Sequence, residues 1–361
     1  MQLIKILFML FSIAFATGVI DKIFGDKLKL GSKIEEGFII MAKAVFSMLG
    51  ILYLYPFLGM LLVKPSKFLA QLFHTDSAIL ISCFLPIDMG GYHISQQVSK
   101  DEIAKVIGGI LLSSNLGATI GFTYPVAFGI LKGESEEDFI KGSLIGIGCI
   151  PIAVVFTSML WGYNVLRSLK LVAIVVIVTF VLAIGVSKGW RFLITAMKFL
   201  GSTMNVVNLV GLALLGYHIL TNKPLVPIKT ALQDYITLPL KMAVLIGSSY
   251  VFFTIVYNFL MSRFRLFKSS CTLNQAGLEG MLMLLVNCVP TLYLFDKMDK
   301  RSKILASALC MTAASALGPQ LAFVATFAYS HVLPFLFNKF MGAVIAIFAI
   351  CILSTKEGEA F

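Results

Sequence analysis

Long apolar runs separated by short polar segments fill almost the whole chain. Most of these runs reach the roughly 20 residues that an α-helix needs to cross the hydrocarbon layer of a bilayer. The short alternating segments typical of membrane β-barrels do not occur in the sequence. We therefore expect an all-α polytopic membrane protein with about 9–11 transmembrane segments. The predicted spans are residues 2–20, 37–62, 103–131, 140–164, 169–187, 199–221, 242–261, 303–330 and 336–354.

Two shorter apolar stretches are interrupted in the middle. Residues 78–95 contain "PIDMGG" and residues 277–296 contain "VNCVP". Half of such a stretch is too short to cross a bilayer, so we expect re-entrant hairpins, with spanning segments as the alternative. Residues 64–77 and 222–240 are amphipathic, and we expect them to lie at the membrane interface.

The two interrupted stretches begin longer segments that resemble each other. In each segment a polar residue, Asp88 or Asn287, lies at the interruption, and a short charged loop and a long span follow. The span is itself interrupted, by "NLGATIGF" in the first segment and by "ALGPQLAF" in the second, about 200 residues later. This order indicates an internal duplication. If the two hairpins enter from opposite faces, the copies form an inverted repeat, and the corresponding broken segments mark a transport site.

The duplication also defines the expected organisation of the chain. We expect one transmembrane domain, residues 1–361, with repeat-like halves 37–131 and 242–330 around a linking region, 140–240. The first run resembles a signal peptide but is long for one, so we interpret it as the first span. The distribution of Lys and Arg favours a cytoplasmic loop at 21–36.

Composition excludes a soluble globule. The chain is 58% apolar and only 13% charged, with a mean hydropathy of +0.93, which leaves too little polar surface to cover a water-soluble domain. Its net charge of +11 comes from Lys and Arg scattered between the apolar runs, which is typical of topology signals and not of a nucleic-acid interface. The six cysteines show no metal-ligand spacing, so we expect neither a metal nor another cofactor.

Asp88 is the strongest candidate for substrate contact. A carboxylate within a membrane segment costs about 2.5–3.5 kcal/mol on insertion scales, so its presence there indicates a function. It could be the counter-ion of a cation, or it could cap the half-helix that follows, and the two roles can coexist. Gly90 and Gly91 allow either close approach of a ligand to the backbone or a tight hairpin apex.

Four further polar residues are candidates for the same site. Asn287 could cap a half-helix or bind a hydroxyl, because its amide both donates and accepts hydrogen bonds. Asn115 and Thr119 could line a cavity or bond within their own helix, and Gln320 lies in the matching motif of the second segment. No nucleophile–base pair is visible, so we do not expect an enzyme. A channel or scaffold remains an alternative to a transporter.

Five motifs together resemble the ethanolamine-utilisation permease family, EutH. They are "EEGF" at 35–38, "DMGG" at 88–91, "GATIGFTYPVAFGI" at 117–130, Asn287 with Pro290, and "SALGPQLAF" at 315–323. The resemblance covers nearly the whole chain, and it implies movement of ethanolamine across the cytoplasmic membrane to supply the ethanolamine ammonia-lyase pathway. Asp88, Gly90, Gly91, Gly117, Thr119 and Asn287 match the family pattern.

The sequence also departs from that pattern. Some relatives have an acidic residue and a histidine where this chain has Pro319 and Gln320, so Asp88 would have to supply the negative charge here. Another small polar solute, such as an amine, an amino acid or a nucleoside, is the alternative substrate. The sequence leaves open whether a proton is coupled to transport and whether the chain forms a homo-oligomer.

Overall fold

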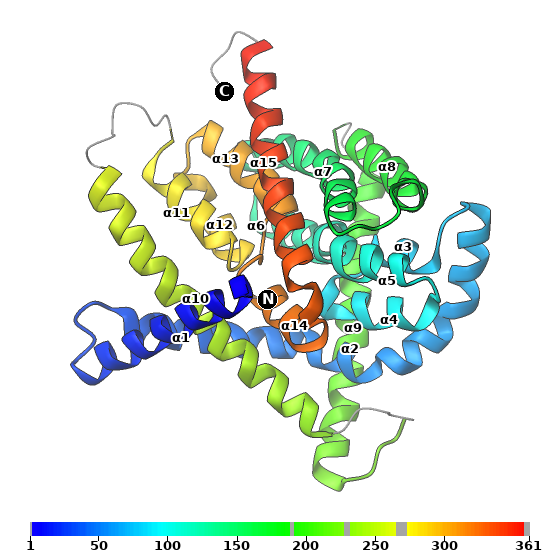
Figure 1. Ribbon diagram of the computed structural model, residues 1–361, viewed down its shortest axis with the longest axis horizontal. Helices are drawn as coiled ribbons and strands as arrows, with labels where there is room; N and C mark the ends of the chain where they lie inside the picture. The colour runs from blue at the N-terminus through cyan, green and yellow to red at the C-terminus, as the bar shows by residue number, and fades with distance from the viewer. Residues whose placement is uncertain (1, 188–190, 227–231, 265–272, 357–361) are drawn as a thin grey trace.

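The described structure consists entirely of helices and the loops that join them (Figure 1). It is a computed structural model that describes residues 2–187, 191–226, 232–264 and 273–356. No strand occurs in these ranges, which confirms the predicted all-α class. The long helices are α1 (Gln2–Ile23), α2 (Leu30–Leu72), α7 (Glu134–Leu160), α8 (Val165–Ser187), α9 (Arg191–Thr221), α10 (Leu232–Phe264) and α15 (Val332–Lys356).

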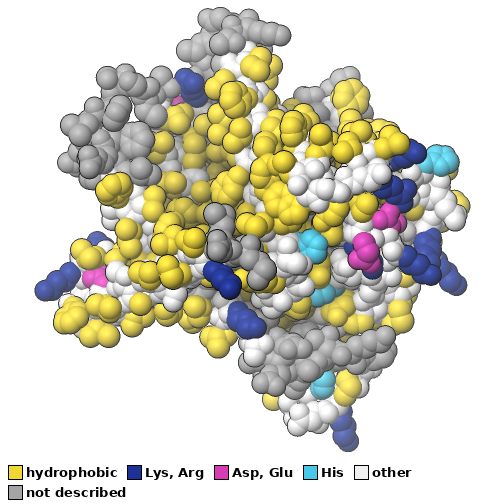
Figure 2. Space-filling model, in the orientation of Figure 1, with side chains coloured by type: hydrophobic (Ala, Val, Ile, Leu, Met, Phe, Trp, Pro, Cys, Tyr) yellow, Lys and Arg dark blue, Asp and Glu magenta, His cyan; other side chains and the backbone are white. Residues whose placement is uncertain are grey.

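Six helical stretches in the described part of the chain are long and apolar enough to cross a membrane. They are Lys5–Ile23, Leu49–Leu72, Glu102–Ile130, Glu134–Leu160, Val165–Leu182 and Tyr329–Leu353, and Asn205–Thr221 and Leu240–Val256 are shorter apolar stretches. Large apolar side chains lie exposed along these helices and cover much of the face in Figure 2, where most of the visible Lys and Arg side chains lie toward the edges. This surface suits lipid, and the chain is a multi-pass membrane protein.

The two amphipathic segments do not form separate elements. Residues 64–72 continue α2, which runs for 43 residues despite Pro56 and Pro65. Proline is tolerated in long membrane helices because neighbouring helices compensate for the lost backbone hydrogen bond, and α2 packs along α9 and α10. Residues 232–240 likewise belong to α10, and residues 227–231 of the second segment lie outside the described ranges.

Both interrupted stretches form helical hairpins. The first consists of α3 (Ser77–Ser82) and α4 (Gly91–Val98), joined by a loop and a single 3₁₀ turn, η1 (Ile87–Met89). The second consists of α11 (Gln275–Leu284) and α12 (Cys288–Leu294). The two arms of each hairpin pack against each other. In the view of Figure 1 the hairpins lie on opposite sides of α15.

The long segments after the hairpins are interrupted in two different ways. The first stays helical from α5 (Glu102–Val106) to α6 (Tyr124–Ile130), through two π-helical stretches, η2 (Ile107–Gly117) and η3 (Thr119–Thr123). The second breaks between α13 (Lys300–Thr312) and α14 (Pro319–Phe327). The predicted interruption at 115–122 is therefore a widened helix and not a break, whereas that at 316–323 overlaps a true break.

Candidate functional site

The apex of the first hairpin depends on Gly90. Its φ of 96° lies in the left-handed region, which glycine adopts without strain, and this turn reverses the chain between η1 and α4. Gly90 is the N-cap of α4, and no side chain caps that helix. The alternative in which Asp88 caps the half-helix is therefore wrong. Its carboxylate lies before the turn and lines a cavity instead.

Gly91 allows close packing inside the hairpin. Its N–H donates to the carbonyl of Pro86 at 2.9 Å, and a Cβ at this position would overlap the carbonyl oxygen of Leu85. Neither Gly90 nor Gly91 is among the residues that line the cavity. Both glycines thus have a structural reason, the tight apex, for their presence in "DMGG".

The apex of the second hairpin is capped by a side chain. The Oδ1 atom of Asn287 accepts a hydrogen bond from the Val289 N–H at 2.9 Å, so the predicted capping role is confirmed. The Thr291 hydroxyl donates to the Gly280 carbonyl at 2.8 Å and joins the two arms. Asn287 also lines the cavity.

Each hairpin apex lies against a glycine of the long segment that follows it. A Cβ on Gly117 would overlap the Leu85 carbonyl oxygen, and a Cβ on Gly318 would overlap the Val286 carbonyl oxygen. The same offset in sequence separates Leu85 from Val286 and Gly117 from Gly318. It is close to the offset of about 200 residues between the two similar segments. These corresponding contacts support an internal duplication.

The two hairpin apices and the two interrupted segments line one cavity of about 690 Å³. Its walls are largely apolar, with a few polar groups, as in most small-molecule sites. The lining residues are Pro86, Asp88, Met89, Ala118, Phe122, Val126, Glu279, Met283, Asn287, Val289, Pro290, Tyr293, Leu294, Ser315, Pro319 and Gln320.

Three of the predicted site residues lie on this wall: Asp88, Asn287 and Gln320. Gln320 is 6% exposed, and its Oε1 atom has no hydrogen-bond partner among the described residues. A buried amide oxygen without a partner is costly in free energy, so a bound ligand that donates a hydrogen bond would be favoured there.

Asn115 and Thr119 lie elsewhere. Both are buried within the π-helical segment and neither lines the cavity. The Thr119 hydroxyl donates to the Asn115 carbonyl at 2.8 Å, which is the within-helix bond that the sequence left open as an alternative. Both side-chain amide atoms of Asn115 are without a partner in the described part of the chain.

Sequence reasoning did not identify two charged residues of this region. Glu279 lies in α11 and lines the cavity. Lys339 lies in α15, is 1% exposed, and donates to backbone carbonyls of both interrupted segments. The signal in the sequence was the charge itself, inside the apolar stretches 277–296 and 336–354.

An all-helical chain with several membrane-crossing helices and a partly polar cavity between two broken hairpins has the architecture of a membrane transporter. The family profile described as "Ethanolamine utilisation protein, EutH" matches residues 3–353, so the chain belongs to the EutH family. No solved structure matches the chain.

Curated relatives are similar over most of their length. The chain is 27% identical over 347 residues to "Probable ethanolamine permease EutH" of Listeria monocytogenes, covering 96% of this chain and 93% of that protein. It is 26% identical to the protein of the same name in Escherichia coli, covering 91% and 86%. It is also 26% identical to "Uncharacterized protein YxeR" of Bacillus subtilis, covering 91% and 89%. The functional names describe permeases and not enzymes, in agreement with the prediction from sequence.

Proposed function

We propose that the chain is a secondary transporter or facilitator that moves protonated ethanolamine across the cytoplasmic membrane by alternating access. The observation that carries this proposal is the pairing of two carboxylates with two amides around one cavity. Asp88 and Glu279 supply the negative charge that an ammonium group needs, and Asn287 and Gln320 supply partners for a hydroxyl. The names of the relatives point to the same substrate.

The carboxylates also offset the positive potential at the N-terminus of a helix. The half-helix α12 begins at the cavity, and the N-terminus of a helix carries a partial positive charge of up to about +0.5. Such an end favours anions and repels a protonated amine. Asp88 and Glu279, from opposite hairpins, reverse the sign of the local potential. The largely apolar walls lower the local dielectric constant, which makes these interactions stronger than they would be at a surface.

Selectivity for an amino alcohol would come from the amides. A site with buried polar groups that need partners discriminates strongly against an analogue that lacks the matching hydroxyl. The unpartnered Oε1 atom of Gln320 meets this description, and the Asn287 amide lines the same cavity. Ethylamine, which has the charge but no hydroxyl, should therefore compete poorly.

The cavity volume favours one second candidate. About 690 Å³ is large for a substrate of only a few non-hydrogen atoms and falls within the range of sites that hold larger ligands. A larger polar amine, which would use the same two carboxylates, is the second candidate substrate. Competition by such amines against ethanolamine distinguishes the two.

The test is uptake of radiolabelled ethanolamine into proteoliposomes, with and without an imposed pH gradient. Asp88→Asn keeps the shape of the side chain and removes its charge, so we expect uptake at low substrate concentration to fall tenfold or more, about 1.4 kcal/mol. Glu279→Gln should reduce uptake less, because Asp88 still supplies one negative charge in the cavity. A pH gradient that changes the rate would identify a coupled proton, and equal rates would identify a facilitator.

The matched control is Asp76→Asn. Asp76 caps α3 by accepting from the Ala78 N–H at 2.8 Å, it does not line the site cavity, and asparagine caps helices equally well. This variant should transport like the wild type. Wild-type uptake by a folded, monodisperse Asp88→Asn protein would overturn the assignment of Asp88.

A further inference from the structure

Lys339 is a charged side chain in the interior of the protein. It lies in α15, within a stretch that can cross the membrane, and only 1% of its surface is exposed. A lysine this close to a helix end could have extended its ammonium group to the membrane surface. It does not do so here, and a charge kept within a membrane segment must be stabilised by specific partners.

The partners of Lys339 are two backbone carbonyls. Its Nζ atom donates to the Ser114 carbonyl at 2.5 Å and to the Ala314 carbonyl at 2.9 Å. Ser114 lies in the π-helical stretch η2, and Ala314 lies in the break between α13 and α14. The ammonium group therefore joins the two interrupted segments, one from each of the similar halves of the chain.

No carboxylate neutralises this ammonium directly. Asp88 lies close enough for its charge to act on Lys339, yet both hydrogen-bond partners of Nζ in the described structure are carbonyl oxygens. The ring of Phe335, 5.9 Å from Nζ, adds a weak attraction. The ammonium is thus held mainly by carbonyl oxygens at irregular backbone deep in the protein.

Carbonyl oxygens at irregular backbone inside a transporter are the groups that coordinate Na⁺. In this chain a covalently attached cation already lies between such carbonyls. We propose that the Lys339 ammonium replaces a bound metal cation at this position, holding the Ser114 and Ala314 carbonyls together so that neither folding nor transport needs Na⁺. The independence of transport from Na⁺ rests on the proposed function, whereas the independence of folding from Na⁺ does not.

A fixed cation also completes the charge pattern of the site. Asp88 and Glu279 together contribute at most two negative charges, and the Lys339 ammonium contributes one positive charge. One protonated amine then makes the set neutral. A second mobile cation would give an excess of positive charge, which a site of low dielectric constant disfavours.

The test compares melting temperatures of the purified protein in NaCl and in N-methylglucamine chloride at equal ionic strength. The wild type should melt at the same temperature in both salts. Lys339→Ala removes the donor and leaves space between the two carbonyls. In N-methylglucamine chloride its melting temperature should therefore be lower than that of the wild type. Sodium should then raise its melting temperature saturably, as a ligand that binds only the folded state does.

Asn338→Ala is the control on the same helix. Asn338 is fully buried and donates to the Leu111 carbonyl of the same π-helical stretch, but it carries no charge. This variant should melt lower than the wild type in both salts by the same amount. Rescue of Asn338→Ala by Na⁺ would show that the response is not specific to the position of the ammonium, and would count against the proposal.

If Lys339→Ala does not fold, measurements on the wild type alone test the proposal. Saturable stabilisation of the wild type by Na⁺, or ethanolamine uptake that requires Na⁺, would overturn the proposal. A Lys339→Ala protein as stable as the wild type and indifferent to Na⁺ would also overturn it. If the predicted melting temperatures are observed and the wild type transports no ethanolamine, the result supports the replacement of a metal cation by the Lys339 ammonium and overturns the proposed function.

Discussion

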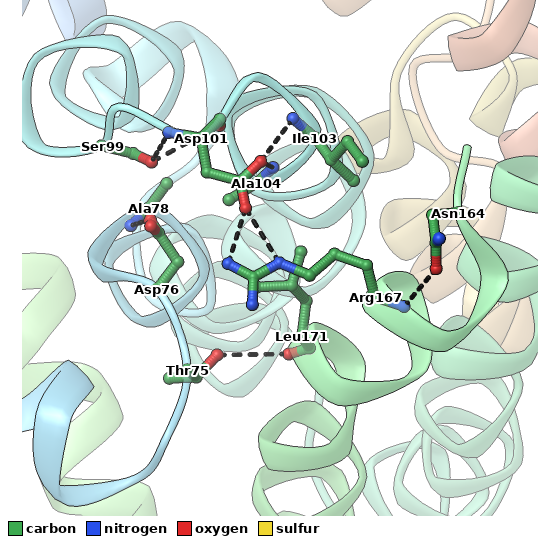
Figure 3. Close-up of polar contacts among 10 residues, drawn as sticks. All are labelled: Thr75, Asp76, Ala78, Ser99, Asp101, Ile103, Ala104, Asn164, Arg167 and Leu171. Carbon is green, nitrogen blue, oxygen red and sulfur yellow. Dashed lines mark hydrogen bonds and ion pairs between the residues drawn. The ribbon is translucent and has the colours of Figure 1, made fainter.

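Asp101 shows how single polar residues hold the first hairpin in place at its outer end. It follows α4 and caps α5, accepting from the Ile103 N–H at 2.9 Å and the Ala104 N–H at 3.3 Å. Its other oxygen accepts from Nη2 and Nε of Arg167 in α8, at 2.7 and 3.0 Å (Figure 3). Nearby, the Thr75 hydroxyl donates to the Leu171 carbonyl. The loops around the hairpin are therefore fastened to α8.

These contacts predict an acid-sensitive contribution to stability. Burial alone would raise the pKa of the Asp101 carboxyl, but hydrogen bonds from Arg167, Ala104 and Ile103 hold that pKa below its ordinary value. The ionised form is therefore favoured in the folded state. The contribution of the ionised Asp101 carboxylate to stability is fully present above the pKa of the unfolded state, about 3.9. It is lost as the pH falls through the lower pKa of the folded state.

Asp101→Asn should lower the free energy of unfolding at neutral pH by about 1 kcal/mol, because half of the Arg167 side chain is exposed and asparagine keeps the cap. The variant should also lose less stability than the wild type below about pH 4. Melting temperatures in detergent from neutral to acidic pH measure both effects. Glu102→Gln is the control, since Glu102 is largely exposed. Parallel curves for Asp101→Asn and the wild type would contradict the prediction.

At the level of residues, the sequence identified polar groups beside helix breakers and missed charges inside regular helix. Asp88, Asn287 and Gln320 each lie within three residues of a proline, and all three line the cavity. Glu279 and Lys339 lie within helices. A sequence gives the depth of such a residue along its helix, but the face it presents depends on how the helices pack.

The elements of the site fit together through glycines of the interrupted segments that pack against the hairpin apices. Gly117 and Gly318 lie in contact with the carbonyls of Leu85 and Val286, where a side chain would overlap backbone. Backbone atoms cannot move aside as the end of a flexible side chain can, so the hairpin itself would have to shift.

Gly117→Ala and Gly318→Ala should each destabilise the protein by about 1–3 kcal/mol, as overpacking does. Gly148→Ala in α7 is the matched control, because a Cβ there has no atom within 4 Å and alanine favours helix. Thermal unfolding in detergent measures the three variants. Melting temperatures of Gly117→Ala and Gly318→Ala equal to that of Gly148→Ala would show that the hairpins are not held by these contacts.

At the level of elements, both interruptions were predictable but their form was not. Pro319 lacks an N–H and begins α14, so the chain unwinds before it. The matching stretch at 115–122 has no proline, and its helix continues with wider π turns. The choice between a broken and a widened helix depends on tertiary partners such as Lys339, which the local pattern does not show.

The whole molecule brings both similar segments to one cavity. Each segment contributes a hairpin apex and an interrupted helix, and Lys339 of α15 joins the two interrupted helices. This arrangement suits alternating access around a central site, in which one half moves against the other. The inverted relation between the halves and the boundaries at 37–131 and 242–330 stay predictions.

The central claim, that this cavity holds the amine, is tested most directly by protection of a cysteine on its wall. Ser315 lines the cavity and Ser330 is exposed outside it, so Ser315→Cys and Ser330→Cys form a matched pair. Both are made in a background in which Cys271 and Cys351 are replaced by serine. The rate of labelling by a small, membrane-permeant thiol reagent is then measured against ethanolamine concentration. We predict that ethanolamine slows labelling of Ser315→Cys, with half-protection near the KM for uptake, and leaves Ser330→Cys unchanged. Labelling of a transport-competent Ser315→Cys protein that stays equally fast at saturating ethanolamine would contradict the account.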